Sequence, residues 1–287
     1  MKKLKHLISI FIGILLFVSC VPEADENGNL LHGLDGSGNS GGGGTGGGGT
    51  TPPIVANKVV SKIFTHAKDE DTGQWEDTTT TFNYENKLLK SISVSGGETI
   101  TFEYNADQKI SKMTSSAFTG IYTYNTNKQA TKLSIDLGGI SQIVTDFTYD
   151  GSGNVSKMKN VTSMTFPFTM NINRDDVLSY NGAQVSKCVS TYTVTPAGAG
   201  SFANATSTYT YDSKISPFYT LPLEYNLFNI SFGGANSFVL SKNNLTKAVV
   251  VSDINDTTNY TYTYDSEGYA TKGTSGEEYS TFEYKKL

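Results

Sequence analysis

The chain contains few of the residues that most enzymes and metalloproteins depend on. Its 287 residues include two cysteines, three histidines and one tryptophan, and Arg174 is its single arginine. Zinc sites built from several His or Cys residues are excluded by these counts. The formal net charge is −5, which leaves no basic footprint for nucleic acid. We therefore expect no metal, no cofactor and no nucleic-acid partner.

Catalytic motifs are also scarce. His66 is the only histidine in the part of the chain that we expect to fold, so a Ser-His-Asp triad would have to use it. No phosphate-binding loop or dinucleotide fingerprint sits between a strand and a helix. The acidic run at Asp69–Asp71 lacks calcium-loop spacing and is interpreted as a solvated hairpin turn. Paired carboxylates remain open as a route to glycoside cleavage, because any two acids can meet in a cleft.

The N-terminus has the composition of an export signal. Three lysines at positions 2, 3 and 5 precede an apolar run over residues 7–18, which is too short for a membrane-spanning helix. A small residue, Ser19, stands directly before Cys20, and this pattern resembles the bacterial lipobox. We expect residues 1–19 to be removed and Cys20 to be acylated, which anchors the chain to a membrane. Cys188 then has no disulfide partner and is predicted to be a small core residue.

Residues 20–53 are predicted to form a flexible tether. Twelve glycines fall between residues 21 and 53, and such a segment buries too little apolar surface to order itself. Its acidic start at residues 21–26 is similar to the export signal of surface lipoproteins in Bacteroidetes-type bacteria. This likeness implies the cell-surface side of the outer membrane, with a periplasm-facing position as the alternative. We expect residues 54–287 to form the folded domain.

This domain repeats. An aromatic-x-Tyr step is followed by a polar turn and then by an apolar-x-Lys step, as in Phe147-Thr148-Tyr149 with Val155 and Lys157. The second tyrosine of each copy falls at Tyr84, Tyr104, Tyr124, Tyr149, Tyr180, Tyr211, Tyr264 and Tyr284. Three of these spacings are 20 residues, which suits one hairpin of two strands and two turns.

The repeat predicts an all-β fold. Residues i and i+2 share one face of a strand, so each aromatic pair should point into the core while Thr and Ser point outward. Eight copies imply roughly sixteen strands in an antiparallel up-and-down meander, and a sheet that wide must curl. We expect a strongly curved sheet or a barrel-like shell.

Two resemblances follow from these residues. The stretch from Tyr262 to Lys272 is similar to the YD repeats of RHS-type surface proteins. The combination of lipobox, glycine-rich tether, repeats and the break after Tyr211 looks like a family of Bacteroidetes lipoproteins of unknown function. That likeness implies a porin-like β fold and an envelope location, with no activity attached. A transmembrane porin would need an uninterrupted apolar band, whereas these strand faces carry Thr, Ser and Lys.

One segment breaks the period. Residues 217–230 are the most apolar part of the domain, and Pro217 and Pro222 exclude a central strand. We interpret this segment as a plug that fills the shell, with an exposed aromatic binding loop as the alternative. The second interpretation, together with the lone tryptophan, makes four residues candidate ligand contacts: Trp75, Phe218, Tyr219 and Tyr225.

Three function classes stay open. The leading one is a non-catalytic module that binds a glycan, a peptide or a partner protein. The second is a structural envelope lipoprotein without a small ligand, and the third is a carboxylate-dependent hydrolase. An exposed aromatic patch favours the first class, and a deep cleft with two close acids favours the third.

Overall fold

The computed structural model describes residues 58–69, 72–165, 169–197, 200–234, 236–253 and 255–287. The predictions for residues 1–53, including those for Cys20, lie outside this range. The described part is an antiparallel sheet of 17 strands with one short α-helix and two 3-10 helices. The strands are β1 (Val59–Lys68), β2 (Trp75–Glu85), β3 (Leu88–Val94), β4 (Thr99–Tyr104), β5 (Ile110–Thr114), β6 (Thr119–Tyr124), β7 (Ala130–Asp136), β8 (Ser141–Tyr149), β9 (Val155–Met164), β10 (Met170–Asn181), β11 (Gln184–Thr195), β12 (Ala205–Ile215), β13 (Asn243–Val251), β14 (Asp256–Asn259), β15 (Thr261–Tyr264), β16 (Ala270–Ser275) and β17 (Glu278–Lys285).

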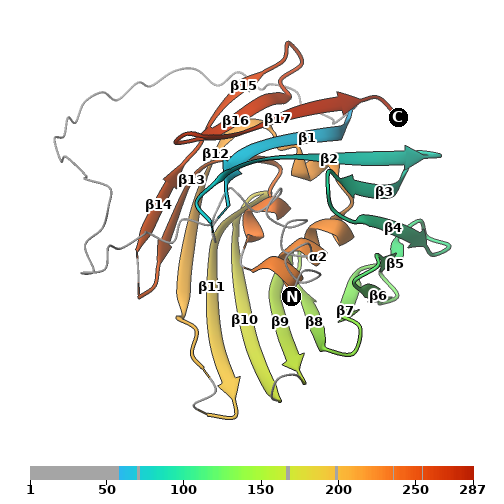
Figure 1. Cartoon of the computed structure of the whole chain (residues 1–287), viewed down its shortest axis with the longest axis vertical. Coiled ribbons are helices and arrows are strands. Elements are labelled where there is room, and N and C mark those ends of the chain that lie inside the picture. Colours follow the sequence, from blue (N-terminus) through green and yellow to red (C-terminus); the bar gives the residue numbers. More distant parts are fainter. Residues whose placement is uncertain (1–57, 70–71, 166–168, 198–199, 235, 254) are drawn as a thin grey trace.

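The sheet curls into a barrel because its first and last strands meet. Successive strands pair antiparallel, and β1 pairs with both β2 and β17. Tyr260 separates the short strands β14 and β15. β14 pairs with β13, and β15 pairs with β16, so the two short strands together occupy one position in the sheet. Figure 1 shows the strands curving around a central helix. The expected antiparallel meander and its barrel-like curvature are confirmed.

Six of the repeats form a hairpin with the same β-bulge. In the copy at β8 and β9, Thr148 faces Lys157 and Tyr149 faces Val155, so Ser156 is the extra residue. The Ser156 hydroxyl donates to the carbonyl of Thr148 at 3.2 Å, which satisfies an acceptor that the bulge would otherwise leave unpaired. Ser111, Thr131 and Ser186 make the equivalent bond in their repeats.

The turns after Tyr104, Tyr124, Tyr149 and Tyr264 are each built around an Asn or Asp side chain that accepts backbone N–H groups. The Asp150 carboxylate accepts the backbone N–H groups of Ser152 and Asn154 at 2.8 and 2.9 Å, and these bonds lower the pKa of Asp150. Gly153 has φ 84° in this turn, whereas Gln108 and Lys128 take the equivalent position with φ near 60° in other copies. All these turns lie at one end of the barrel, here called the repeat-turn end. The opposite end is called the far end.

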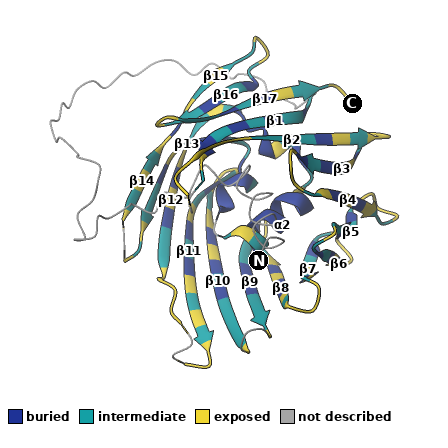
Figure 2. Cartoon of the chain, in the orientation of Figure 1, coloured by how far each residue is buried: buried dark blue, intermediate teal, exposed yellow. Residues whose placement is uncertain are grey.

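The two aromatics differ in burial in most repeats. The first is buried, as for Phe82, Phe102 and Phe147, whereas the second is half-buried against the core; in the copy at Tyr262 and Tyr264 both are half-buried. The expected inward stripe is therefore present, and Figure 2 shows buried and exposed residues alternating along the strands. The second tyrosine is less buried because it stands at the strand end beside the bulge.

The barrel interior is filled by the segment between β12 and β13. This plug, residues 216–241, contains the 3-10 helix η1 (Phe218–Thr220), the helix α2 (Leu223–Gly233) and the 3-10 helix η2 (Ser237–Leu240). Leu227, Phe228 and Ile230 have no exposed surface, and Tyr225 packs edge-on against Phe82 and Phe102. The plug interpretation of the apolar segment is therefore confirmed.

The helical conformation of the plug was not predicted from the sequence. α2 is buried on almost every side, so its apolar residues show no amphipathic period. Among the described residues, no helix is long and apolar enough to cross a lipid bilayer.

Candidate functional site

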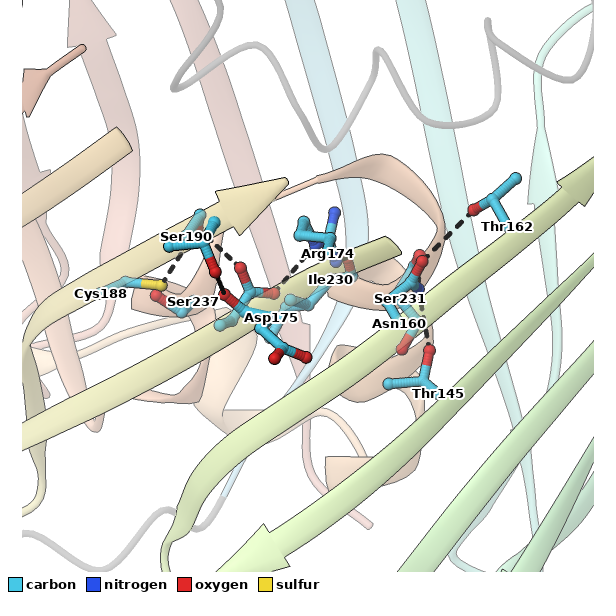
Figure 3. A network of polar contacts seen from close by, with 12 residues as sticks. Thr145, Asn160, Thr162, Arg174, Asp175, Cys188, Ser190, Ile230, Ser231 and Ser237 are labelled. Atoms are coloured by element: carbon cyan, nitrogen blue, oxygen red, sulfur yellow. Dashed lines mark hydrogen bonds and ion pairs between the residues drawn. The ribbon is translucent and has the colours of Figure 1, made fainter. Parts of the chain in front are cut away.

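A buried polar network holds the C-terminal end of α2 (Figure 3). Arg174 Nη2 donates to the carbonyl of Ile230 at 2.7 Å, and Asn160 Nδ2 donates to the carbonyl of Ser231 at 2.8 Å. These carbonyls belong to the last turn of the helix, which has no further helical partners for them. A cation there also complements the negative end of the helix dipole. Arg174 and Asn160 therefore fix the plug inside the barrel.

The same network neutralises the charge of Arg174. Its Nε donates to Asp176 Oδ2 at 2.9 Å, and the Ser190 hydroxyl donates to the other carboxylate oxygen at 2.6 Å. Cys188 lies 3.7 Å from Ser190, and burial raises the pKa of its thiol. A protonated, buried thiol fits the predicted core role of Cys188. The neighbouring Asp175 instead pairs with Lys157 at 3.5 Å on the outer wall, so the two adjacent carboxylates face opposite sides of the sheet.

The other end of α2 meets a tyrosine cluster at the repeat-turn end. Tyr122 donates its hydroxyl to the backbone carbonyl of Glu224, and Lys109 Nζ lies 3.8 Å from Glu224 Oε1. Burial and then the negative charge of Glu224 raise the pKa of Tyr104 and of Tyr149 to about 12. This cluster places the start of α2 at the repeat-turn end.

An exposed aromatic surface lies on the outer wall near the far end. We call Trp75, His66 and Tyr279 the aromatic row, because they stand side by side on the paired strands β2, β1 and β17. His66 stacks on Trp75 with ring centroids 4.6 Å apart and planes 6° apart, and the Tyr279 ring lies 5.1 Å from His66. His66 Nδ1 is 2.6 Å from Asp77 Oδ1, which fixes the orientation of the imidazole.

Cations flank the row on both sides. Lys68 Nζ lies 5.0 Å from the centre of the Trp75 ring, and Lys272 Nζ lies 4.0 Å from that of Tyr279. Both distances are within the range of cation–π attraction. Glu278 is half-buried beside the row, and burial raises the pKa of its carboxyl. The row is therefore a preorganised aromatic surface with charged groups at its margins.

A hollow adjoins the row at Asp77. It has a volume of about 370 Å³ and is lined by Glu76, Asp77, Thr78, Val94, Ser95, Gly96 and Gly97. That volume lies within the range of small-molecule sites. Carboxylates, hydroxyls and glycine backbone around the hollow supply hydrogen-bond donors and acceptors next to an aromatic face.

The structure separates the four predicted contact residues. Trp75 and Tyr219 are 41 % and 47 % exposed, at the far end and at the repeat-turn end respectively. Phe218 and Tyr225 are buried within the plug, where they pack against other aromatic rings. The four residues therefore do not form one surface, and a ligand-contact role remains a prediction for the two exposed ones.

Sequence reasoning found Trp75 but not its two neighbours in the row. Strand alternation places His66 outward, since the residues on either side of it, Thr65 and Ala67, are buried. The alternation does not tell which strands flank β1. Only the closure of the barrel brings Tyr279 of the last strand beside His66.

Comparisons with known proteins support the fold alone. Neither a protein-family model nor a curated protein sequence matches the chain. The structure is similar to a porin-like protein from Bacteroides vulgatus, with 11 % identity, a TM-score of 0.53, and coverage of 80 % of this chain and 100 % of that one. A porin-like protein from Bacteroides uniformis matches at 17 % identity and a TM-score of 0.48, over 79 % of this chain and 96 % of that one.

The porin-like β fold implied by the sequence resemblance is thus supported by a solved structure. Membership of a lipoprotein family and a relation to YD repeats remain predictions.

Proposed function

We propose that this chain is a lipoprotein anchored in the outer membrane through acylated Cys20, and that its domain is a non-catalytic binding module at the cell surface. The domain binds a glycan across the aromatic row and the adjoining hollow. The observation that carries this proposal is the exposed Trp75 stacked on His66 beside a hollow lined by carboxylates and hydroxyls.

The chemistry of sugars fits this arrangement. A pyranose has an apolar C–H face that packs on an aromatic ring, and hydroxyls at its edge that bond to carboxylates and backbone groups. The row offers ring surface already held in place by stacking, so little conformational entropy is lost on binding. Asp77 bonds to His66 of the row and also lines the hollow, so it links the two kinds of contact.

The hydrolase alternative receives less support. Glu76 and Asp77 both line the hollow, but as neighbours in strand β2 their side chains point to opposite faces of the sheet. The adjacent acids Asp175 and Asp176 also face opposite sides of the sheet, and Asp176 is held by Arg174 inside the core. A structural role without a ligand is the remaining alternative, and the plug that fills the barrel is the observation that favours it.

The test is a glycan screen on the purified protein, with the intrinsic fluorescence of Trp75 as a second readout. We expect Trp75→Ala to lower the affinity for a glycan found in the screen by about tenfold or more, the equivalent of ~1.4 kcal/mol. Phe202→Ala is the matched control, because Phe202 is 50 % exposed and stacks on Tyr192 elsewhere. Binding that survives Trp75→Ala, or a screen without any binder, would favour the structural role.

A further inference from the structure

We propose that the open edge of β2 beside the hollow is a docking site for an extended basic peptide segment, which adds to the sheet as a short strand. This inference goes beyond the proposed glycan site, because the peptide occupies the edge of the sheet whereas the aromatic row lies on its outer wall. The two sites share the hollow, so a bound peptide excludes the part of a glycan that enters it.

The register of β2 leaves part of its edge without a neighbour. β2 pairs with β1 from Trp75 onward, but its pairing with β3 begins only at Thr80. Ser95 extends this contact by one residue, because its amide donates to the carbonyl of Thr79 and its hydroxyl accepts the Thr79 amide, both at 2.8 Å. Among the described residues, no strand or turn pairs with this side of β2 before Thr79.

Strand alternation identifies the free backbone groups. The N–H and C=O groups of Thr79 point toward the β3 side, and residues two apart in a strand direct these groups to the same side. The N–H and C=O groups of Trp75 and Asp77 therefore point into the open edge. Unpaired groups of this kind are a template for one further strand.

The hollow provides space for that strand. It is lined by β2 and by the turn from β3 to β4, which presents Gly96 and Gly97 to it. Gly96 has φ 68°, and a side-chain carbon added there would meet nothing within 4 Å. The turn therefore leaves open space beside the free edge.

The charge at the edge selects a basic segment. Glu76 lies across from the buried Ala67, on the inner face of the sheet, and Asp77 lies across from His66, on the outer wall. No described residue that lines the hollow carries a positive charge. Two adjacent basic residues in an added strand place one cation on each face, next to one of these carboxylates. Cross-strand pairs of opposite charge are favourable.

A second copy of this chain fits the edge less well. Pairing two β2 edges brings Glu76 and Asp77 of one copy beside the same carboxylates of the other, and like charges on neighbouring strands repel each other. The acidic edge therefore discourages self-association while it attracts a basic partner.

The experiment measures the binding of three fluorescein-labelled peptides to the purified full-length protein by fluorescence anisotropy. The first peptide has a central Lys-Arg step between two Thr-Val-Thr flanks. The second is the same peptide with N-methyl groups on the two central amides, and the third has Glu-Glu in place of Lys-Arg. N-methylation keeps both charges and removes strand hydrogen bonds, so it separates edge pairing from charge attraction alone.

We expect the first peptide to bind, and the other two to bind more weakly by about tenfold or more, since each lacks one of the two interactions. The measurement uses no glycan, so its outcome is independent of the glycan screen.

Variants of the edge locate the bound peptide. Asp77→Pro removes the amide that points into the open edge, leaves the ladder with β1 intact and should abolish measurable binding. Asp77→Asn keeps that amide and should weaken binding by less. The control is Glu103→Gln, which removes a 66 % exposed carboxylate from the outer wall of β4 and should leave binding unchanged.

Hydrogen exchange on the unsubstituted protein gives a readout that does not depend on the folding of any variant. The amide of Asp77 should exchange more slowly once the Lys-Arg peptide is bound. Equal binding of the N-methylated peptide, an Asp77 amide that stays unprotected, or no binding of the Lys-Arg peptide would overturn the proposal.

Discussion

The hydroxyl of Tyr149 donates a 2.9 Å hydrogen bond to the backbone carbonyl of Ala130, which is the aliphatic residue of the preceding repeat. Tyr124 reaches Ile110 in the same way, Tyr180 reaches Val155, and Tyr211 reaches Val185. The bulge after each repeat tyrosine disturbs the strand ladder locally, and a side-chain donor from the next hairpin satisfies a carbonyl there. The repeat is therefore a chain of contacts from one hairpin to the one before it.

The hydroxyl of Tyr149 should stabilise the fold independently of the aromatic ring. Tyr149→Phe keeps the ring but removes the donor, so the Ala130 carbonyl loses its partner, and we expect a loss of about 1–2 kcal/mol in the free energy of unfolding. Thr148→Ala on the exposed face should change it by less than about 0.5 kcal/mol. Denaturant unfolding measures both. Equal costs would mean that the bond to Ala130 contributes nothing.

Alkaline pH should destabilise the barrel. The pKa of Tyr104 and of Tyr149 is raised from 10.0 to about 12 in the folded protein. Unfolded tyrosine therefore loses its proton at a lower pH than folded tyrosine, so the stabilising contribution is complete below pH 10 and is lost as pH rises toward 12. Melting curves across this window, together with ultraviolet titration of tyrosinate, test the effect. Ionisation of all tyrosines near pH 10 in the folded protein would contradict it.

The buried ion pair that holds the plug should be sensitive to the loss of one partner. Arg174→Met leaves Asp176 charged and without exposed surface, and we expect this to cost about 3–5 kcal/mol. Arg174→Met combined with Asp176→Leu should cost less, because no unpaired charge remains. The control is Lys157→Met, which breaks the exposed pair with Asp175 and should cost under about 1 kcal/mol. If the double variant were no more stable than Arg174→Met, the unpaired charge would not be the cause.

The membrane anchor should be separable from the fold. We expect Cys20→Ala to release the protein from the membrane fraction while its circular dichroism spectrum stays that of a β protein. Cys188→Ala is the matched control. Cys188 is buried in the domain, so its substitution should leave membrane attachment unchanged. Fractionation and detergent-phase partitioning provide the readout. Continued partitioning of the Cys20→Ala protein into detergent would show that another segment holds it.

The aromatic-x-Tyr period carried most of the information about the fold. It predicted the hairpins, the inward aromatic faces and a sheet wide enough to curl, because strand alternation and turn chemistry are local properties. The bulge was also present in the sequence, as the Ser or Thr between the aliphatic residue and the lysine in copies such as Val155-Ser156-Lys157. The role of this hydroxyl residue is visible only in the structure, where the Ser156 hydroxyl donates a hydrogen bond to the carbonyl of Thr148.

The repeat was enough to predict the all-β meander. For the apolar segment at residues 217–230, the two prolines excluded a central strand and the bulky apolar side chains favoured burial, while an exposed loop stayed open as the alternative. The helical conformation of this segment is seen only in the fold, because a helix buried on almost every side has no amphipathic period in its sequence. Closure of the barrel likewise set His66 between Trp75 and Tyr279. Contacts between the two ends of a chain depend on how many strands complete the circle, which is a property of the whole sheet and of no single repeat.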